Sequence, residues 1–84
     1  MNRLDFLILS ILNSNDAFGN LSGMTLKEIS DSDELNDYKK DTIYRQLLSF
    51  KTVGNINYGV KDGHAATYYI TDDGKSYLRK EKVK

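Results

Sequence analysis

The chain has 84 residues, enough for one domain with one small hydrophobic core. Apolar residues make up 39% and charged residues 29%, the balance of a folded protein rather than of a disordered segment. Cysteine is absent and His64 is the only histidine, which excludes disulfides, thiolate or multi-histidine metal sites, and cysteine- or histidine-pair catalysis. We therefore expect a single domain over residues 1–84, with no enzyme activity, metal or cofactor.

The net charge is zero, from 12 basic and 12 acidic residues, but the charges are unevenly distributed. Residues 1–37 contain two basic and seven acidic side chains, whereas residues 38–84 contain ten basic and five acidic ones. A first part of −5 followed by a second part of +5 can give a neutral protein one basic face. An ordinary solvated surface explains the same asymmetry equally well.

The N-terminus has neither a basic region before an apolar core nor a small-residue cleavage site. Its longest strictly apolar run, residues 6–9, is far too short to span a membrane. The sequence therefore predicts a cytoplasmic protein without membrane contact.

Apolar residues at positions 4, 7, 8, 11 and 12 have helical spacing and predict a first helix over residues 3–13. Phe6 and Leu9 project from the opposite side of that helix. Two interpretations stay open: a later helix covers them, or they form a surface for self-association. We take Phe6 and Leu9 as candidates for a dimer interface.

Residues 13–23 predict a loop, since they are rich in Asn, Ser, Asp and Gly, with Phe18 and Leu21 tucked against the core. Met24 is placed to form a short strand beside a later hairpin. Thr25 and Glu28 have the spacing of a capping box, which predicts the start of a short helix ending near residue 32.

A polar turn over residues 33–37 precedes the segment that dominates the chain, residues 39–56. Asn36 or Asp37 is expected to cap the helix in this segment, and Gly54 to end it. Its core face is formed by Ile43, Leu47 and Phe50. Two short helices joined by a brief turn predict a helix-turn-helix.

The opposite, polar face of this helix is centred on Arg45, and two lysines lie at its entry. Basic residues at a helix N-terminus oppose the helix dipole, so a nearby phosphate would account for their position. Arginine pairs with guanine, and hydroxyl and amide side chains reach base edges or phosphates. Simple exposure to solvent is the alternative. The candidate DNA-binding residues on this helix are Lys39, Lys40, Asp41, Thr42, Tyr44, Arg45, Gln46 and Ser49.

Two alternating segments, residues 56–60 and 66–70, predict a β-hairpin around Asp62 and Gly63. Ile56, Tyr58 and Val60 form the expected inward face of the first strand. The tip adds Lys61 and His64 as candidate contacts, although the sequence favours a solvent-exposed turn residue over a phosphate contact at His64.

Thr71 and two following aspartates predict the start of a last short helix. Tyr77 and Leu78 are expected to dock it on the core, before a basic, frayed end at residues 79–84.

The order of these elements resembles the winged helix-turn-helix of PadR- and MarR-type transcriptional regulators. Three segments carry the resemblance. The residues Thr42-Ile43-Tyr44-Arg45-Gln46-Leu47, Phe50, Gly54 and Ile56 are similar to the run "TVYR-L--L---GLI", residues 68–75 to "YYLTEEGK", and RLDFLILSIL to a PadR first helix. The resemblance implies a mostly helical α+β fold: a three-helix core, a β-hairpin wing and a short C-terminal helix.

The same resemblance implies a small regulator that binds double-stranded DNA in a sequence-specific way, as a homodimer. The wing tip lacks the arginine that many such regulators insert into the minor groove, so Lys61 and His64 take that place. Two alternatives remain: a winged-helix protein-interaction module without DNA binding, and a replication or partition protein that binds DNA. No effector ligand is indicated.

Overall fold

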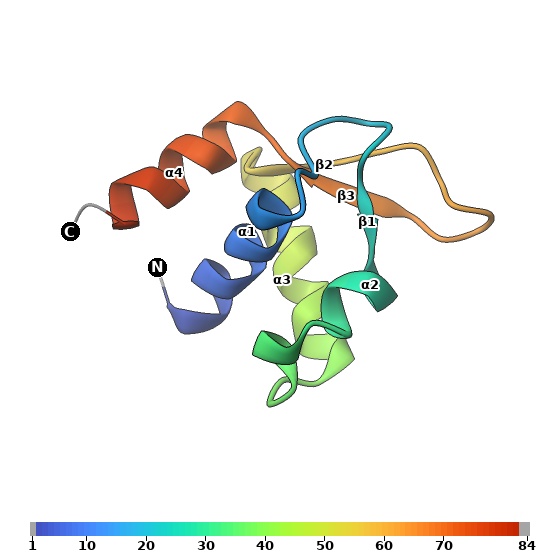
Figure 1. Cartoon of the computed structure of the whole chain (residues 1–84), viewed down its shortest axis with the longest axis horizontal. Coiled ribbons are helices and arrows are strands. Elements are labelled where there is room, and N and C mark those ends of the chain that lie inside the picture. The colour runs from blue at the N-terminus through green and yellow to red at the C-terminus, as the bar shows by residue number, and fades with distance from the viewer. Residues whose placement is uncertain (1, 83–84) are drawn as a thin grey trace.

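The computed structural model describes residues 2–82, and the last two residues of the predicted basic end lie outside this range. Helices make up most of the chain and the strands are short (Figure 1), so the expected mostly helical α+β class is confirmed. The elements in order are α1 (Arg3–Ser14), β1 (Met24–Thr25), α2 (Leu26–Ser30), the 3-10 turn η1 (Asp33–Leu35), α3 (Lys40–Val53), β2 (Ile56–Tyr58), β3 (Thr67–Ile70) and α4 (Asp72–Lys82).

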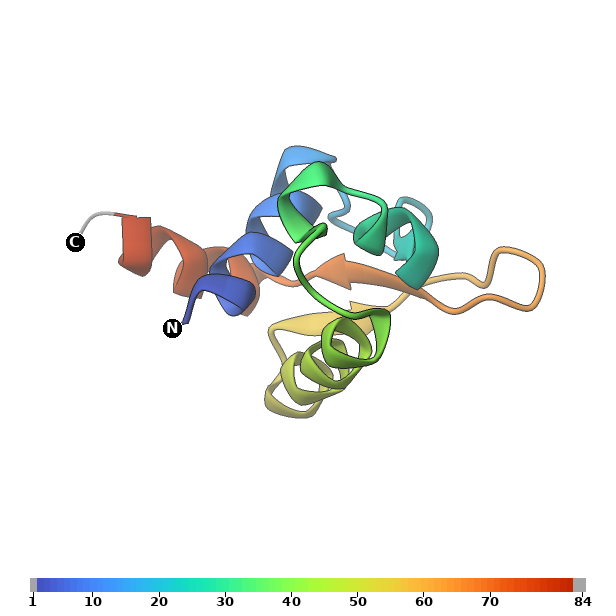
Figure 2. The ribbon, with the colours of Figure 1, turned by 90° about the horizontal axis from the view of Figure 1, so that it is seen from below.

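The three strands form one antiparallel sheet in the order β1-β3-β2. Met24 pairs with Tyr68 and Ile56 with Ile70, so the third strand expected at Met24 is confirmed. Residues 56–70, which we call the wing, project from the helical body as a long hairpin (Figure 2). Both described ends of the chain lie at the opposite end of the molecule from the wing tip (Figure 1).

The core is one cluster of apolar side chains contributed by all four α-helices and by the sheet. Helix α4 packs against α1, and Leu78 is buried as the sequence predicts. Leu9 is also fully buried in this core. Its assignment to a dimer surface was therefore wrong, because no part of the Leu9 side chain is exposed. Phe6 is half-buried against the same core.

The loop between α1 and β1 is attached to the sheet by Ala17 rather than by its larger side chains. Ala17 is fully buried, and its carbonyl oxygen accepts a hydrogen bond from the Ile70 N–H at 2.8 Å. Leu21 is 86% exposed and Phe18 lies at the surface beneath the Lys75 ammonium, 4.0 Å from the ring centroid. The expectation that Phe18 and Leu21 tuck into the core was therefore wrong.

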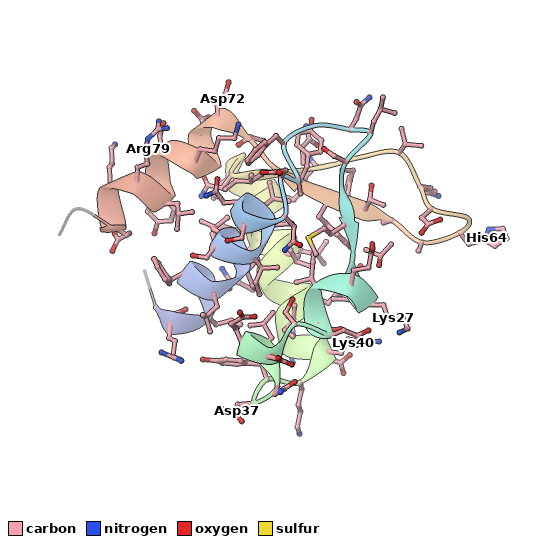
Figure 3. The ribbon with its side chains drawn as sticks, viewed as in Figure 1. Lys27, Asp37, Lys40, His64, Asp72 and Arg79 are labelled. Atoms are coloured by element: carbon pink, nitrogen blue, oxygen red, sulfur yellow. The ribbon has the colours of Figure 1, made fainter. Side chains whose placement is uncertain are left out.

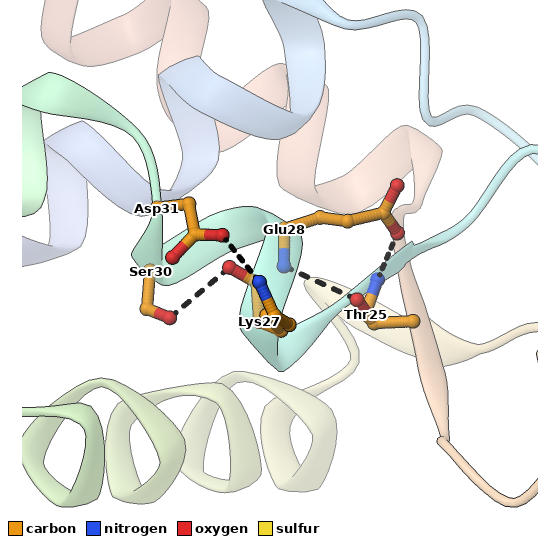
Figure 4. A network of polar contacts seen from close by, with 5 residues as sticks. All are labelled: Thr25, Lys27, Glu28, Ser30 and Asp31. Carbon is orange, nitrogen blue, oxygen red and sulfur yellow. Dashed lines mark hydrogen bonds and ion pairs between the residues drawn. The ribbon is translucent and has the colours of Figure 1, made fainter.

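Helix α2 begins with the capping box that the sequence predicts (Figure 4). The Glu28 N–H donates to the Thr25 hydroxyl at 3.1 Å, and the Thr25 N–H donates to the Glu28 carboxylate at 2.9 Å. These bonds satisfy two backbone donors that a helix start leaves free. The helix ends at Ser30, two residues before the expected end.

Helix α3 begins at Lys40 with Lys39 in the capping position, and no side chain accepts a hydrogen bond there. The expected caps, Asn36 and Asp37, were wrong because the helix begins later in the chain. Asn36 ends the 3-10 turn, and the Tyr38 N–H then bonds back to the Leu35 carbonyl.

The C-terminus of α3 ends at Gly54, as expected, with the left-handed φ of 89° that glycine adopts at little cost. The Gly54 N–H donates to the Lys51 carbonyl, and the Asn55 N–H donates to the Phe50 carbonyl at 3.0 Å. This pair of bonds is a Schellman motif, and it turns the chain sharply into β2.

The end of α3 and the start of α4 share a tight junction. The Thr71 hydroxyl donates to the Gly54 carbonyl at 2.6 Å and accepts from the Gly74 N–H at 3.1 Å. The Thr71 N–H also donates to the Asn55 carbonyl at 3.1 Å. Gly74 lies so close to this turn that a Cβ there would collide with the Asn55 oxygen.

The inward face expected for the first wing strand is confirmed only at its start. Ile56 is buried, but Tyr58 is 45% and Val60 56% exposed. Tyr58 lies beside α3 at an open groove, under the Lys51 ammonium, and Val60 lies past the end of β2, so neither side chain enters the core.

Gly74→Ala is expected to lower the free energy of unfolding by about 1–3 kcal/mol, because the added methyl meets backbone and the Ile70 side chain. The usual preference of helices for alanine acts in the opposite direction. Gly19→Ala is the control, since nothing lies within 4 Å of a Cβ there. Urea unfolding measures both variants, and equal stability of Gly74→Ala and the parent chain would contradict the junction.

Candidate nucleic-acid interface

The outer face of α3 is exposed and without internal partners. Within residues 2–82, none of the side chains predicted there forms a hydrogen bond or an ion pair. Gln46 is half-buried, and the others, Lys39, Lys40, Asp41, Thr42, Tyr44, Arg45 and Ser49, are exposed. This face therefore offers cationic and hydrogen-bonding groups that a ligand can engage without first breaking a bond of the protein.

The N-terminal end of α3 favours an anion. Its free backbone N–H groups lack a capping side chain, and Lys39 and Lys40 stand beside them. The helix dipole adds partial positive charge at the same place. Asp41 in the first turn offsets part of this charge.

The wing tip is a tight turn closed by Asp62 and Ala65, whose backbones exchange hydrogen bonds of 2.9 and 3.0 Å. Gly63 takes the positive φ of 63° that the turn requires. His64 stands exposed at the far end of the wing (Figure 3), and the structure does not bring it next to α3. Lys61, in contrast, lies where the wing approaches α3.

A groove that we call the aromatic groove separates α3 from the wing. Its lining consists of Tyr44, Tyr58, Gly59, Lys61, Ala66 and Tyr68. The rings of Tyr58 and Tyr68 lie 5.6 Å apart at 56°, and the Lys51 ammonium is 5.4 Å from the centroid of the Tyr58 ring. Sequence reasoning missed Lys51, Tyr58 and Tyr68 as site residues.

Burial raises the pKa of the Tyr68 hydroxyl above its usual value. The neighbouring Tyr44 and Tyr58 hydroxyls act in the same direction, since a negative charge on one phenolate disfavours another. Tyr68 therefore stays a neutral hydrogen-bond donor throughout the physiological range.

The root of the wing is braced by the loop that follows α1. The Val60 N–H donates to the Asn20 carbonyl at 2.8 Å, and the Thr67 hydroxyl donates to the Val60 carbonyl at 2.8 Å. Gly59 fits between these groups: a Cβ there would lie 2.6 Å from the Thr67 hydroxyl and 2.7 Å from the Asn20 oxygen. This bracing fixes the direction in which the wing leaves the body.

Residues 2–82 hold no group of three His, Cys, Asp or Glu side chains placed to bind a metal ion. No helix among them is long and apolar enough to cross a bilayer.

No protein-family model matches the chain, and no curated protein matches it in sequence. Three solved structures are similar to it. TubR from Bacillus megaterium pBM400 has a TM-score of 0.79 and 23% identity, over 94% of this chain and 83% of that one. A DNA-binding TubR fragment from Clostridium botulinum has a TM-score of 0.72 and 24% identity, over 95% of each chain. A candidate DNA-binding protein from Ralstonia eutropha has a TM-score of 0.70 and 12% identity, also over 95% of each chain.

The chain has the winged helix-turn-helix fold. In this fold α2 and α3 form the helix-turn-helix, α3 is the recognition helix, and the β2–β3 hairpin is the wing. The fold predicted from the sequence is thereby confirmed, whereas identities below 25% leave function to be argued from the site.

Gly59→Ala is expected to loosen the wing, because its methyl displaces the Thr67 hydroxyl or the Asn20 carbonyl. Hydrogen exchange at the Val60 amide should accelerate, since that N–H bonds to Asn20. Gly19→Ala, in the same loop as Asn20, should leave this amide unchanged. Equal exchange rates in Gly59→Ala and the parent chain would show that the brace does not hold the wing.

Proposed function

We propose that the chain binds double-stranded DNA in a sequence-dependent way through α3 and the wing. The observation that carries this proposal is the outer face of α3, where Arg45 and two lysines stand exposed with no partner within residues 2–82. A recognition helix places such a face in the major groove, where arginine reads guanine and lysines contact phosphates.

The charge distribution supports the same function. Phosphate contacts supply most of the affinity of a DNA-binding protein, and the basic residues of this chain concentrate in residues 38–84, which form α3, the wing and α4. Two of the similar structures are those of a DNA-binding TubR fragment and of a candidate DNA-binding protein. We place the protein with its DNA in the cytoplasm.

We propose regulation of transcription as the process, on the resemblance of residues 42–47 to PadR- and MarR-type regulators. Plasmid partition is the second candidate, and the similarity to two TubR proteins favours it. Both processes use the same contact between a recognition helix and duplex DNA.

We further propose that the protein acts as a homodimer, since one arginine and two lysines make a single α3 a weak reader of DNA. Two copies related by a two-fold axis double the contacts and match a palindromic site. Phe6, half-buried on α1, stays the candidate for the contact between copies.

Arg45→Ala is expected to weaken binding to a duplex selected from a random pool and to relax discrimination at one base pair by about 1–3 kcal/mol. Arg79→Ala removes the same charge from α4, at the end of the molecule opposite the wing tip (Figure 3), and should leave discrimination unchanged. Fluorescence anisotropy on selected and random duplexes measures both. Equal losses of affinity on the two duplexes would show that Arg45 contacts phosphate and reads no base.

A further inference from the structure

The aromatic groove continues into a second hollow beside it. The two share Tyr44, Ala66 and Tyr68, so they form one depression along the side of α3 that faces the wing. The depression begins at Leu26 in α2 and ends at Tyr58 on β2. Its length and its open sides suit a strand that passes through it rather than a small ligand that is enclosed.

The floor of this depression is aromatic and partly exposed. Tyr44 is 41% and Tyr58 45% exposed, and the neighbouring Tyr68 is buried at their side. None of their three hydroxyls forms a hydrogen bond within residues 2–82. Tyrosine rings that combine an exposed apolar face with an unused hydroxyl are suited to a partner with both apolar and polar parts.

The rim of the depression is cationic. Lys40 and Lys61 line it, and the Lys51 ammonium lies over the Tyr58 ring. Lys27 also lines it, but its ammonium is paired with Asp31 at 3.0 Å (Figure 4). Asp62 contributes a carboxylate to the second hollow and none of the lining residues of the aromatic groove is acidic. The charge complements an anionic partner.

The geometry of DNA identifies which anionic partner passes here. With α3 in the major groove and the wing in the adjacent minor groove, one sugar–phosphate strand separates the two grooves. That strand must cross the space between α3 and the wing, and the aromatic groove is this space.

We infer that the aromatic groove is the seat of this sugar–phosphate strand, with Tyr58 and Lys51 as direct phosphate contacts. Deoxyribose carbons pack on the tyrosine rings, the Tyr58 hydroxyl donates to a phosphate oxygen, and the Lys51 ammonium neutralises a phosphate. The inference rests on the proposed function and adds two residues to the proposed DNA contacts, both of which bind the backbone and read no base. It gives the protein a contact that fixes how α3 enters the major groove.

Single neutral methylphosphonates placed along a selected duplex test this contact. One or two substitutions on the strand between the major- and minor-groove contacts should weaken binding of the parent chain about tenfold, because a hydrogen bond to a charged group is lost. The same substitutions should cost much less in Tyr58→Phe and Lys51→Gln, which already lack the contact. Lys51→Gln should also lower the salt dependence of binding by about one counterion.

Two control variants match these substitutions. Tyr69→Phe removes a hydroxyl from the β3 residue that follows Tyr68, and the Tyr69 side chain faces the other side of the sheet. Lys80→Gln removes an exposed charge from α4. Both should keep the full methylphosphonate effect. Urea unfolding of all four variants checks that they remain folded.

The outcomes separate this inference from the proposed function. If the parent chain and Arg45→Ala differ on the selected duplex while Tyr58→Phe and Lys51→Gln behave like the parent chain at every phosphate, the groove is empty and only the inference fails. If the parent chain binds no duplex, both fail.

Discussion

The bond from the Thr71 hydroxyl to the Gly54 carbonyl, at 2.6 Å, is the contact on which the arrangement of this protein depends. It joins the end of the recognition helix to the start of α4, and the strands of the wing run out from and back to this point. The positive φ of Gly54 lets the chain turn there, and the absence of a side chain at Gly74 lets the Asn55 carbonyl approach. This junction and the bonds that brace the root of the wing together set the angle between recognition helix and wing.

The functional surfaces follow from that angle. Because β2 leaves the junction alongside α3, Tyr58 comes to lie beside Tyr68 and beneath the Lys51 ammonium, at one end of the aromatic groove. The loop after α1 then supports the root of the wing through Asn20, so the hairpin projects in one direction. A helix and a braced hairpin with lysines beside the groove between them form the shape that the proposed DNA strand requires, and the protein reaches it with a net charge of zero.

Features with a local cause could be predicted from the sequence. The capping box at Thr25, the glycine end of α3 and the buried stripe through Ile43 each depend on residues within one or two helical turns. The errors arose where segments distant in the sequence determine whether a side chain is buried. Leu9 is buried because other elements, α4 among them, pack against α1, and Tyr58 is exposed because it lines an open groove beside α3. The groove was missed for the same reason, since Lys51 and Tyr58 meet across an α3–β2 turn that helical or strand periodicity alone does not describe.

Duplex binding at two salt concentrations tests the central claim most directly, because it asks whether phosphate neutralisation drives association. Anisotropy of a labelled duplex from a random-pool selection, measured at about 50 and 200 mM salt, should show affinity that falls steeply as salt rises. The selected duplex should also compete better than a random one of equal length. A protein-interaction module with this fold would bind neither duplex at either concentration, and that result would contradict the account.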